Sequence, residues 1–138
     1  MVDKPKLDQM LASLRQYAAV LAGLSRVPRD VFLANPDKLG NAKYHFIIAI
    51  ESCIDISNHV IASEGYRFPQ DNADAFVVLT DEGILAAAQR APLQAIARFR
   101  NRLVHLYQDI DDGAVHDYLR SSLSDLEAFA QAIARQEW

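Results

Sequence analysis

Cysteine, glycine and proline are all scarce in this sequence of 138 residues, which has one cysteine, five glycines and five prolines. The single cysteine, Cys53, excludes an intrachain disulfide. A chain of this length buries roughly two thirds of the surface that its unfolded form exposes, so it can form a core without a metal or a disulfide. We therefore predict one globular domain over residues 1–138.

Long apolar runs and several well-known motifs are also missing. No stretch approaches about 18 uninterrupted apolar residues, and the start Met1–Lys6 lacks the apolar run of a secretory signal. This predicts a cytoplasmic protein with no membrane partner. There is no phosphate-binding glycine loop, no Gly-x-Ser-x-Gly turn and no zinc-type Cys/His spacing, which argues against ordinary kinases, α/β-hydrolases and zinc fingers.

The charge is mildly acidic overall but unevenly distributed. Fourteen Lys and Arg against eighteen Asp and Glu give a net charge of −4, which argues against a broadly basic surface. The segment Gly83–Gln108 nevertheless holds four arginines and no acid, whereas acids dominate from Asp109 onward. Such a local basic segment fits a phosphate-binding cleft, but charge alone favours one solvated helix face.

Apolar residues recur at spacings of three and four in every long segment, the pattern of amphipathic helices. The central segment is also too long to be a strand in a small domain. We predict an all-α, up-and-down bundle of four main helices plus short helices. The expected main helices are Leu7–Leu24, Asn41–Glu64, Pro92–Ile110 and Val115–Ile133, and the short ones are Arg29–Ala34, Ala73–Leu79 and Ile84–Arg90.

One pattern in the basic segment suggests a reaction, because Arg100 precedes His105 by five positions and Tyr107 follows His105 by two. Histidine can exchange a proton near neutral pH, and arginine can hold a phosphate through paired donors. On RNA, His105 would move protons while a 2′-hydroxyl attacks the neighbouring phosphate, with Arg98 and Arg102 binding phosphates and no metal or cofactor required. Alternatively, the arginines are solvated and His105 packs or caps.

Helix geometry argues for two copies of the chain at such a site. On an unbroken helix, Arg100 and His105 lie about 140° apart, while Arg100 and Tyr107 lie nearly in register. Arginine and histidine face one cleft only if the helix bends near His105 or a second copy packs across a two-fold axis. A homodimer can therefore form a better site than a single chain.

Two acidic groups need separate interpretations. Glu51, Asp55 and His59 share one face of the central helix and could bind a metal, but no facing helix has the Glu-x-x-His spacing of carboxylate metal bundles. We instead expect Glu51 and Asp55 to meet and position arginines of the basic segment, on a face that a dimer interface could also bury. A second group, at positions 109, 111 and 112, fits a solvated turn, or it steers a cationic or metal-bearing partner toward the tyrosine.

The motif residues carry a resemblance to a known family. The segment Arg100–Tyr107 resembles the Arg-x4-His-x-Tyr motif of the HEPN superfamily, and the chain is similar, more narrowly, to the HepT-like toxins. The resemblance covers nearly the whole chain from about Ala42. Further features in family order are the helix Ala49–Ile56 followed by His59, the loop with Pro69, Phe76, and the pair Ile110-Asp111.

The resemblance implies a dimeric, metal-independent ribonuclease toxin with RNA as its substrate. Arg100 and His105 would be the catalytic pair and Asn101 the supporting polar residue. Arg98 also satisfies a six-residue gap to His105, so the Arg-Asn pair selects Arg100. Tyr107 would accept AMP groups from a minimal nucleotidyltransferase antitoxin, which would place a bulky anion where RNA phosphate binds. The alternative is a non-catalytic module that binds nucleotide or RNA, or docks the nucleotidyltransferase.

Overall fold

The computed structural model describes all residues, 1–138, and contains seven helices and no strand. The predicted all-α class is confirmed. The helices are α1 (Lys4–Ser25), α2 (Arg29–Leu33), α3 (Pro36–Glu64), α4 (Asn72–Asp81), α5 (Ala87–His105), α6 (Asp112–Ser121) and α7 (Leu123–Ala134).

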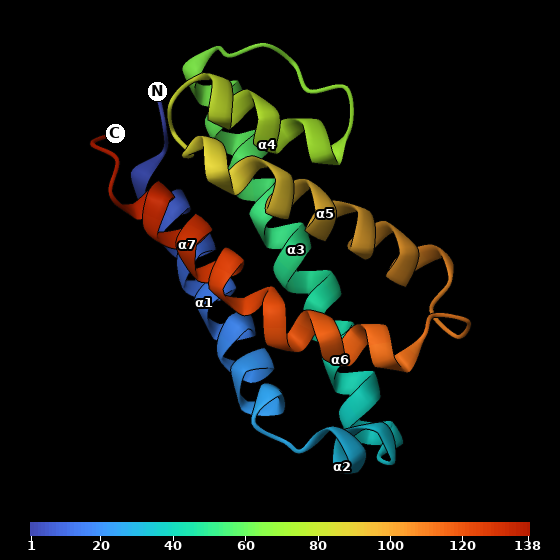
Figure 1. Cartoon of the computed structure of the whole chain (residues 1–138). Helices are drawn as coiled ribbons and strands as arrows, with labels where there is room; N and C mark the ends of the chain where they lie inside the picture. Colours follow the sequence, from blue (N-terminus) through green and yellow to red (C-terminus); the bar gives the residue numbers. More distant parts are fainter.

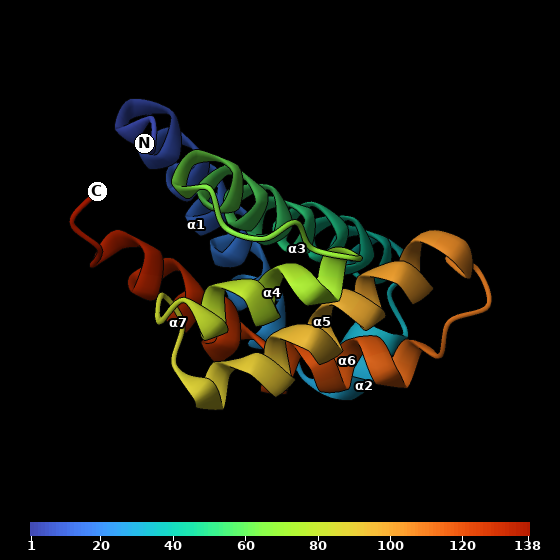
Figure 2. The ribbon, with the colours of Figure 1, turned by 90° about the horizontal axis from the view of Figure 1, so that it is seen from above.

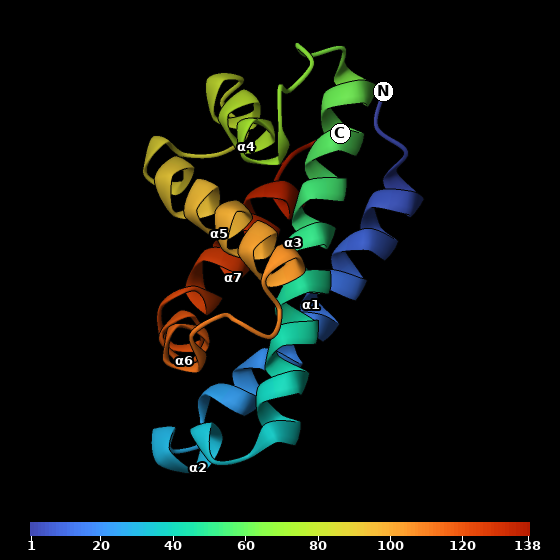
Figure 3. The same ribbon diagram turned by 90° about the vertical axis from the view of Figure 1, so that its right-hand side faces the viewer.

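Helix α3 is the central helix of the molecule, and the other helices pack around it (Figure 1). Helices α1 and α3 lie side by side, and α4 to α7 pack along one flank of this pair (Figures 2 and 3). Helix α5 crosses α3, so that the basic segment meets the acidic face of the central helix. Both chain termini lie at the same end of the molecule (Figure 1).

Helix α3 begins at Pro36, earlier than the predicted Asn41. The Asn35 side chain caps its first turn by accepting from two backbone N–H groups, and proline is well tolerated at the first helical position. The helix continues through Gly40, where a Cβ would lie 3.9 Å from the Tyr107 hydroxyl. It ends at Gly65, whose φ of 70° is the left-handed conformation that glycine adopts without strain.

Helix α3 is also long and apolar enough to cross a membrane, judged by length and composition alone. The core helix of a soluble protein passes the same test. Here its apolar side chains, including Phe46, Ile50 and Ile56, are buried against the other helices.

Other predicted helix boundaries are wrong as well. The segment from Ile84 forms no helix of its own, because α5 starts at Ala87 and continues through Pro92. Pro92 has no N–H, so the helix lacks one backbone hydrogen bond, and the residue whose carbonyl would accept it is exposed. Helix α5 stops at His105 instead of Ile110. The final predicted helix is two helices, α6 and α7, which meet at Ser122, where adjacent serines favour a kink.

Candidate functional site

Arg100 is the best-anchored residue of the motif. Its side chain is only 21% exposed, and its Nη2 donates to Glu51 Oε1 on α3 at 2.6 Å. Its Nη1 donates to Asn101 Oδ1 at 3.1 Å, and its buried Nε has no hydrogen-bond partner within the chain. The predicted contact between Glu51 and an arginine is therefore present. A fixed guanidinium with a spare donor is an arrangement often found at functional sites.

Asp55 does not make the contact that was predicted for it. It is exposed on α3, one turn after Glu51, and no hydrogen bond or ion pair joins it to an arginine. Partial burial raises the pKa of Asp55 above its usual value, as does the charge of Glu51, while Arg100 opposes both effects. The charge of Arg100 therefore acts on Asp55 without a contact between the two side chains.

The other two arginines of the motif segment have separate surroundings. Arg102 donates from Nη2 to the Tyr118 hydroxyl at 3.2 Å, and its guanidinium carbon lies 5.7 Å from the centre of the Phe99 ring. Arg98 is exposed and lines a small polar cavity together with Asn101. Both side chains remain reachable from solvent, as phosphate binding requires.

His105 is the last residue of α5 and is exposed. Because the helix is continuous from Arg100 to His105, these two side chains point about 140° apart within one chain, as helix geometry predicts. The structure does not bring the pair together on one face. Within one chain, the two groups therefore form no shared site.

Tyr107 does not lie in register with Arg100, because the helix ends before it. The backbone turns at Leu106, whose φ is −125° and ψ 30°, and residues 106–110 form a hydrogen-bonded turn. The Tyr107 side chain is 41% exposed, with its hydroxyl near Gly40 of α3. The tyrosine is thus displayed beside the first half of α3 and away from the Glu51 contact.

Lys43, which the sequence pattern did not single out, holds this turn in place. Its side chain is 8% exposed, and its Nζ donates to the Tyr107 carbonyl at 2.9 Å. The same ammonium lies 3.6 Å from Asp112 Oδ1 and 5.0 Å from the centre of the Tyr107 ring. The only signal in the sequence was a lysine on an apolar helix face, between Ala42 and Phe46.

The acidic residues after the tyrosine act within the fold. Asp111 caps α6 by accepting from the Gly113 N–H at 2.9 Å, and Asp112 faces Lys43. No three or more His, Cys, Asp and Glu side chains are arranged to hold a metal ion. Glu51 is instead the ion-pair partner of Arg100.

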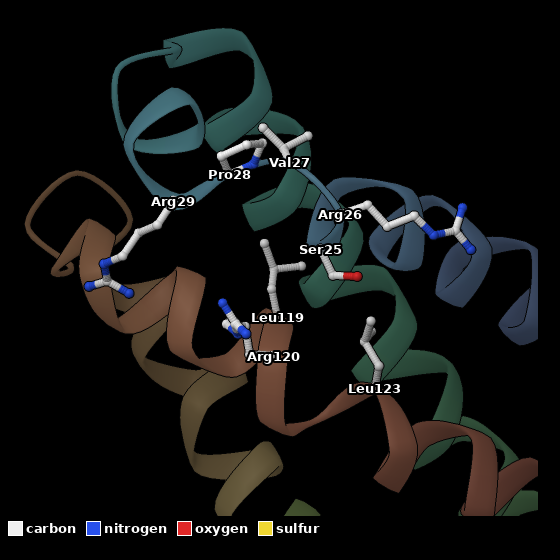
Figure 4. A pocket seen from close by; sticks show the side chains of 8 residues that line it. All are labelled: Ser25, Arg26, Val27, Pro28, Arg29, Leu119, Arg120 and Leu123. Atoms are coloured by element: carbon white, nitrogen blue, oxygen red, sulfur yellow. The ribbon is translucent and has the colours of Figure 1, made fainter.

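A separate cavity of about 440 Å3 lies between the start of α2 and the junction of α6 with α7 (Figure 4). Arg29 extends toward α6, whereas Arg26 points away from it (Figure 4). Arg29 Nη1 lies 3.1 Å from Nδ1 of the buried His116 and 2.8 Å from Asp117 Oδ1. Burial lowers the pKa of His116, and Arg29 and Arg120 lower it further against the opposing effects of Asp117 and the Val27 backbone.

This environment of His116 predicts a pH-dependent stability. The unfolded chain takes up a proton as the pH falls through the ordinary histidine value of 6.5, while the folded protein resists it. Stability is therefore expected to fall below that pH, by at most about 1.4 kcal/mol per pH unit from this group. Urea unfolding from about pH 7 to about pH 5 should show a shallower pH slope in His116→Gln. An unchanged slope would contradict the assignment.

Comparison with known proteins decides the family. The family described as Ribonuclease HepT-like matches residues 7–133, which is nearly the whole chain. The chain belongs to this family. The resemblance inferred from the motif Arg100–Tyr107 is thereby confirmed at the level of the family.

One relative of this HepT-like chain is an mRNA nuclease HepT from Shewanella oneidensis. It is 30% identical over 83 residues, which cover 60% of this chain and 62% of the relative. The match therefore spans slightly less than two thirds of the relative's length.

Solved structures support the same fold. A tri-AMPylated Shewanella oneidensis HEPN toxin in complex with an MNT antitoxin is 21% identical, with a TM-score of 0.87 over 99% of this chain and 100% of the toxin. A toxin–antitoxin structure with AMP-PNP is 20% identical, with a TM-score of 0.86 over 94% of this chain and 98% of the other. At these identities the likeness establishes the helical fold.

Proposed function

We propose that this chain is a metal-independent endoribonuclease, the toxin of a toxin–antitoxin pair, acting on RNA in the cytoplasm. The observation that carries the proposal is the Arg100 guanidinium held by Glu51 and Asn101, with His105 exposed at the end of the same helix. Family membership and the mRNA nuclease activity named for the Shewanella relative support it.

The proposed chemistry is an in-line transfer within the RNA chain. His105 accepts the proton of a 2′-hydroxyl, and the 2′-oxygen forms a bond to the neighbouring phosphorus while the bond to the 5′-oxygen breaks. The departing 5′-oxygen takes up a proton, which leaves a 2′,3′-cyclic phosphate and a 5′-hydroxyl. Arg100 stabilises the negative charge that grows on the phosphate oxygens.

The site is proposed to form between two copies of the chain. Arg100 and His105 point in different directions within one copy, so the arginine of one subunit and the histidine of its partner can face each other across a two-fold axis. The surface around His105 is suited to such contact, because the apolar side chains of Val104 and Leu106 are exposed on either side of it. Isolated monomers would then be inactive.

The proposal is tested by incubating the purified chain with single-stranded RNA in the presence of EDTA. Cleavage that yields 2′,3′-cyclic phosphate and 5′-hydroxyl ends is the expected result. No cleavage by a folded, unmodified dimer would contradict the proposal and favour a non-catalytic binding module.

We further propose that a nucleotidyltransferase antitoxin regulates this chain by transferring AMP to Tyr107. The Tyr107 hydroxyl would attack the α-phosphate of ATP and release pyrophosphate. The hydroxyl sits on an exposed turn that Lys43 anchors, and a neighbouring fold is an AMPylated toxin bound to its MNT antitoxin. The added AMP would place bulk and negative charge two residues from His105 and so hinder RNA binding at the proposed catalytic histidine.

Mass spectrometry after co-expression with a nucleotidyltransferase tests this regulation. The parent chain is expected to gain the mass of one or more AMP groups, and Tyr107→Phe to gain none. Tyr44→Phe, which removes the hydroxyl of another exposed tyrosine, serves as the matched control and should be modified like the parent. Modification of Tyr107→Phe at the parent's level would exclude Tyr107 as the acceptor.

A further inference from the structure

The polar cavity beside the motif is lined by side chains whose hydrogen-bonding groups are unused. Its volume is about 290 Å3, and seven of its eight lining residues are polar. The side chains of Gln70, Asn72, Gln94 and Arg98 make no hydrogen bond within the chain, and Asn101 uses only its Oδ1, to bind Arg100. Four amides and one guanidinium therefore face this space with free donors and acceptors.

The carboxylates of the cavity are already engaged. Asp71 accepts from the Asp74 N–H at 2.7 Å. Asp74 accepts from Arg67 at 2.8 and 3.0 Å and from the Gln70 N–H at 2.8 Å, and the Arg67 contact lowers the pKa of Asp74 to about 2. Two carboxylates beside one free arginine make a poor site for a phosphate alone. Neutral amides are instead suited to the donor and acceptor edges of a nucleobase.

A second, larger cavity continues from the first. It measures about 720 Å3 and shares Asp71 and Asn72 with the polar cavity. Its other walls include Tyr66 and Phe68, and Phe68 is 91% exposed. An aromatic ring left this open to water beside a cavity offers a free face, and unpaired RNA bases commonly stack on such rings.

We propose that these two adjoining cavities bind unpaired bases of an RNA strand, with Phe68 as the stacking platform and the amides of Gln94 and Asn101 as readers of a base edge. RNA is the expected occupant because the polar cavity adjoins the proposed catalytic arginine. Asn101 lines this cavity and also accepts a hydrogen bond from Arg100. This inference rests on the proposed ribonuclease function and adds a base preference near the cut. Arg98 contacts the strand's phosphate at the same place.

The test is an equilibrium binding measurement with fluorescently labelled, single-stranded RNA. His105→Ala serves as the host, so that the RNA stays intact. Phe68→Ala is expected to weaken binding on the order of tenfold, and Phe68→Trp to restore it, because any aromatic face can stack. RNAs in which one nucleotide at a time is abasic should identify the base that stacks on Phe68. At one or more positions, the abasic RNA is expected to bind the host about as weakly as intact RNA binds Phe68→Ala. Phe68→Ala should lose little further affinity for those RNAs.

The amide contacts are tested in the same assay. Gln94→Ala is expected to change which bases are preferred at one position, whereas Gln16→Ala, an exposed amide on α1, should leave binding unchanged. Parent-like affinity in both Phe68→Ala and Gln94→Ala would overturn the inference. So would a loss of affinity that is equal for intact RNA and for every abasic RNA.

Base binding at Phe68 is also distinguishable from protein docking and from catalysis. If Phe68→Ala binds RNA normally but loses affinity for a nucleotidyltransferase, the surface docks a protein and the inference is wrong. If the parent chain cleaves no RNA yet shows the abasic pattern, the proposed nuclease function fails while the base-binding site stands. If the parent cleaves RNA without any abasic dependence, the base-binding site alone is rejected.

Discussion

Cleavage of single-stranded RNA is expected to fall by about 10²–10⁴-fold in His105→Ala, because the variant lacks the group that exchanges protons with the reacting oxygens. Arg100→Ala should lose a comparable or larger factor, since this guanidinium is proposed to stabilise the charge that grows on the phosphate. The measurement is single-turnover cleavage with EDTA present. Circular dichroism should show that both variants stay folded, because one side chain is exposed and the other is partly so.

Matched variants make the result specific to the site. Arg90→Ala removes an exposed arginine from the same helix, outside the motif, and should cleave like the parent. Arg100→Lys keeps the charge but cannot donate to Glu51 and a phosphate with the same fixed geometry, so we expect only partial recovery. Cleavage by His105→Ala at the parent's rate would contradict the proposed chemistry.

A mixture of two inactive variants tests the two-subunit site. If arginine and histidine from different subunits act together, combining Arg100→Ala with His105→Ala subunits should restore part of the activity, because each mixed dimer contains one intact site. Failure of any recovery, with subunit exchange demonstrated, would place both groups in one chain.

The helical class and the pairing of Glu51 with an arginine could be predicted from sequence. The helical class follows from apolar spacing that is clear over long segments. The pairing follows because a carboxylate on α3 has few partners other than arginines once the basic helix packs against it. Which arginine Glu51 would meet did not follow from charge. It follows from packing, because Phe99 and Leu103 turn their helix face inward and leave Arg100 at the edge of the contact with α3.

The position of Tyr107 could not be predicted, because it depends on a residue far away in sequence. Apolar spacing continues to Ile110, so a helix through Tyr107 was the reasonable expectation. The chain turns instead at Leu106. There the Lys43 ammonium donates to the Tyr107 carbonyl and lies over the Tyr107 ring. Because this helix end is fixed by a hydrogen bond from a residue distant in sequence, the neighbouring residues carry no pattern that would predict it.

Phe99→Ala is expected to be the most destabilising single change near the site. Phe99 is fully buried between the motif arginines at 98 and 100, edge-on to Phe46 at 5.3 Å and stacked on Tyr118 at 3.9 Å between ring centres. Removing such a ring costs about 3–5 kcal/mol of unfolding free energy, which is a large share of the roughly 5–15 kcal/mol typical of a domain. Urea denaturation of the parent and the variant measures it.

The same substitution at Phe68 is the matched control, because that ring is exposed and its removal should change stability by less than about 0.5 kcal/mol. Equal losses at the two positions would contradict the packing described for α5. The two variants should also differ in how they lose function. Phe99→Ala would loosen the packing of α5 on α3 and with it the contact between Arg100 and Glu51, so its cleavage should recover when a stabilising osmolyte is added. Phe68→Ala should not respond to the osmolyte, since its effect is on RNA binding and the fold is intact.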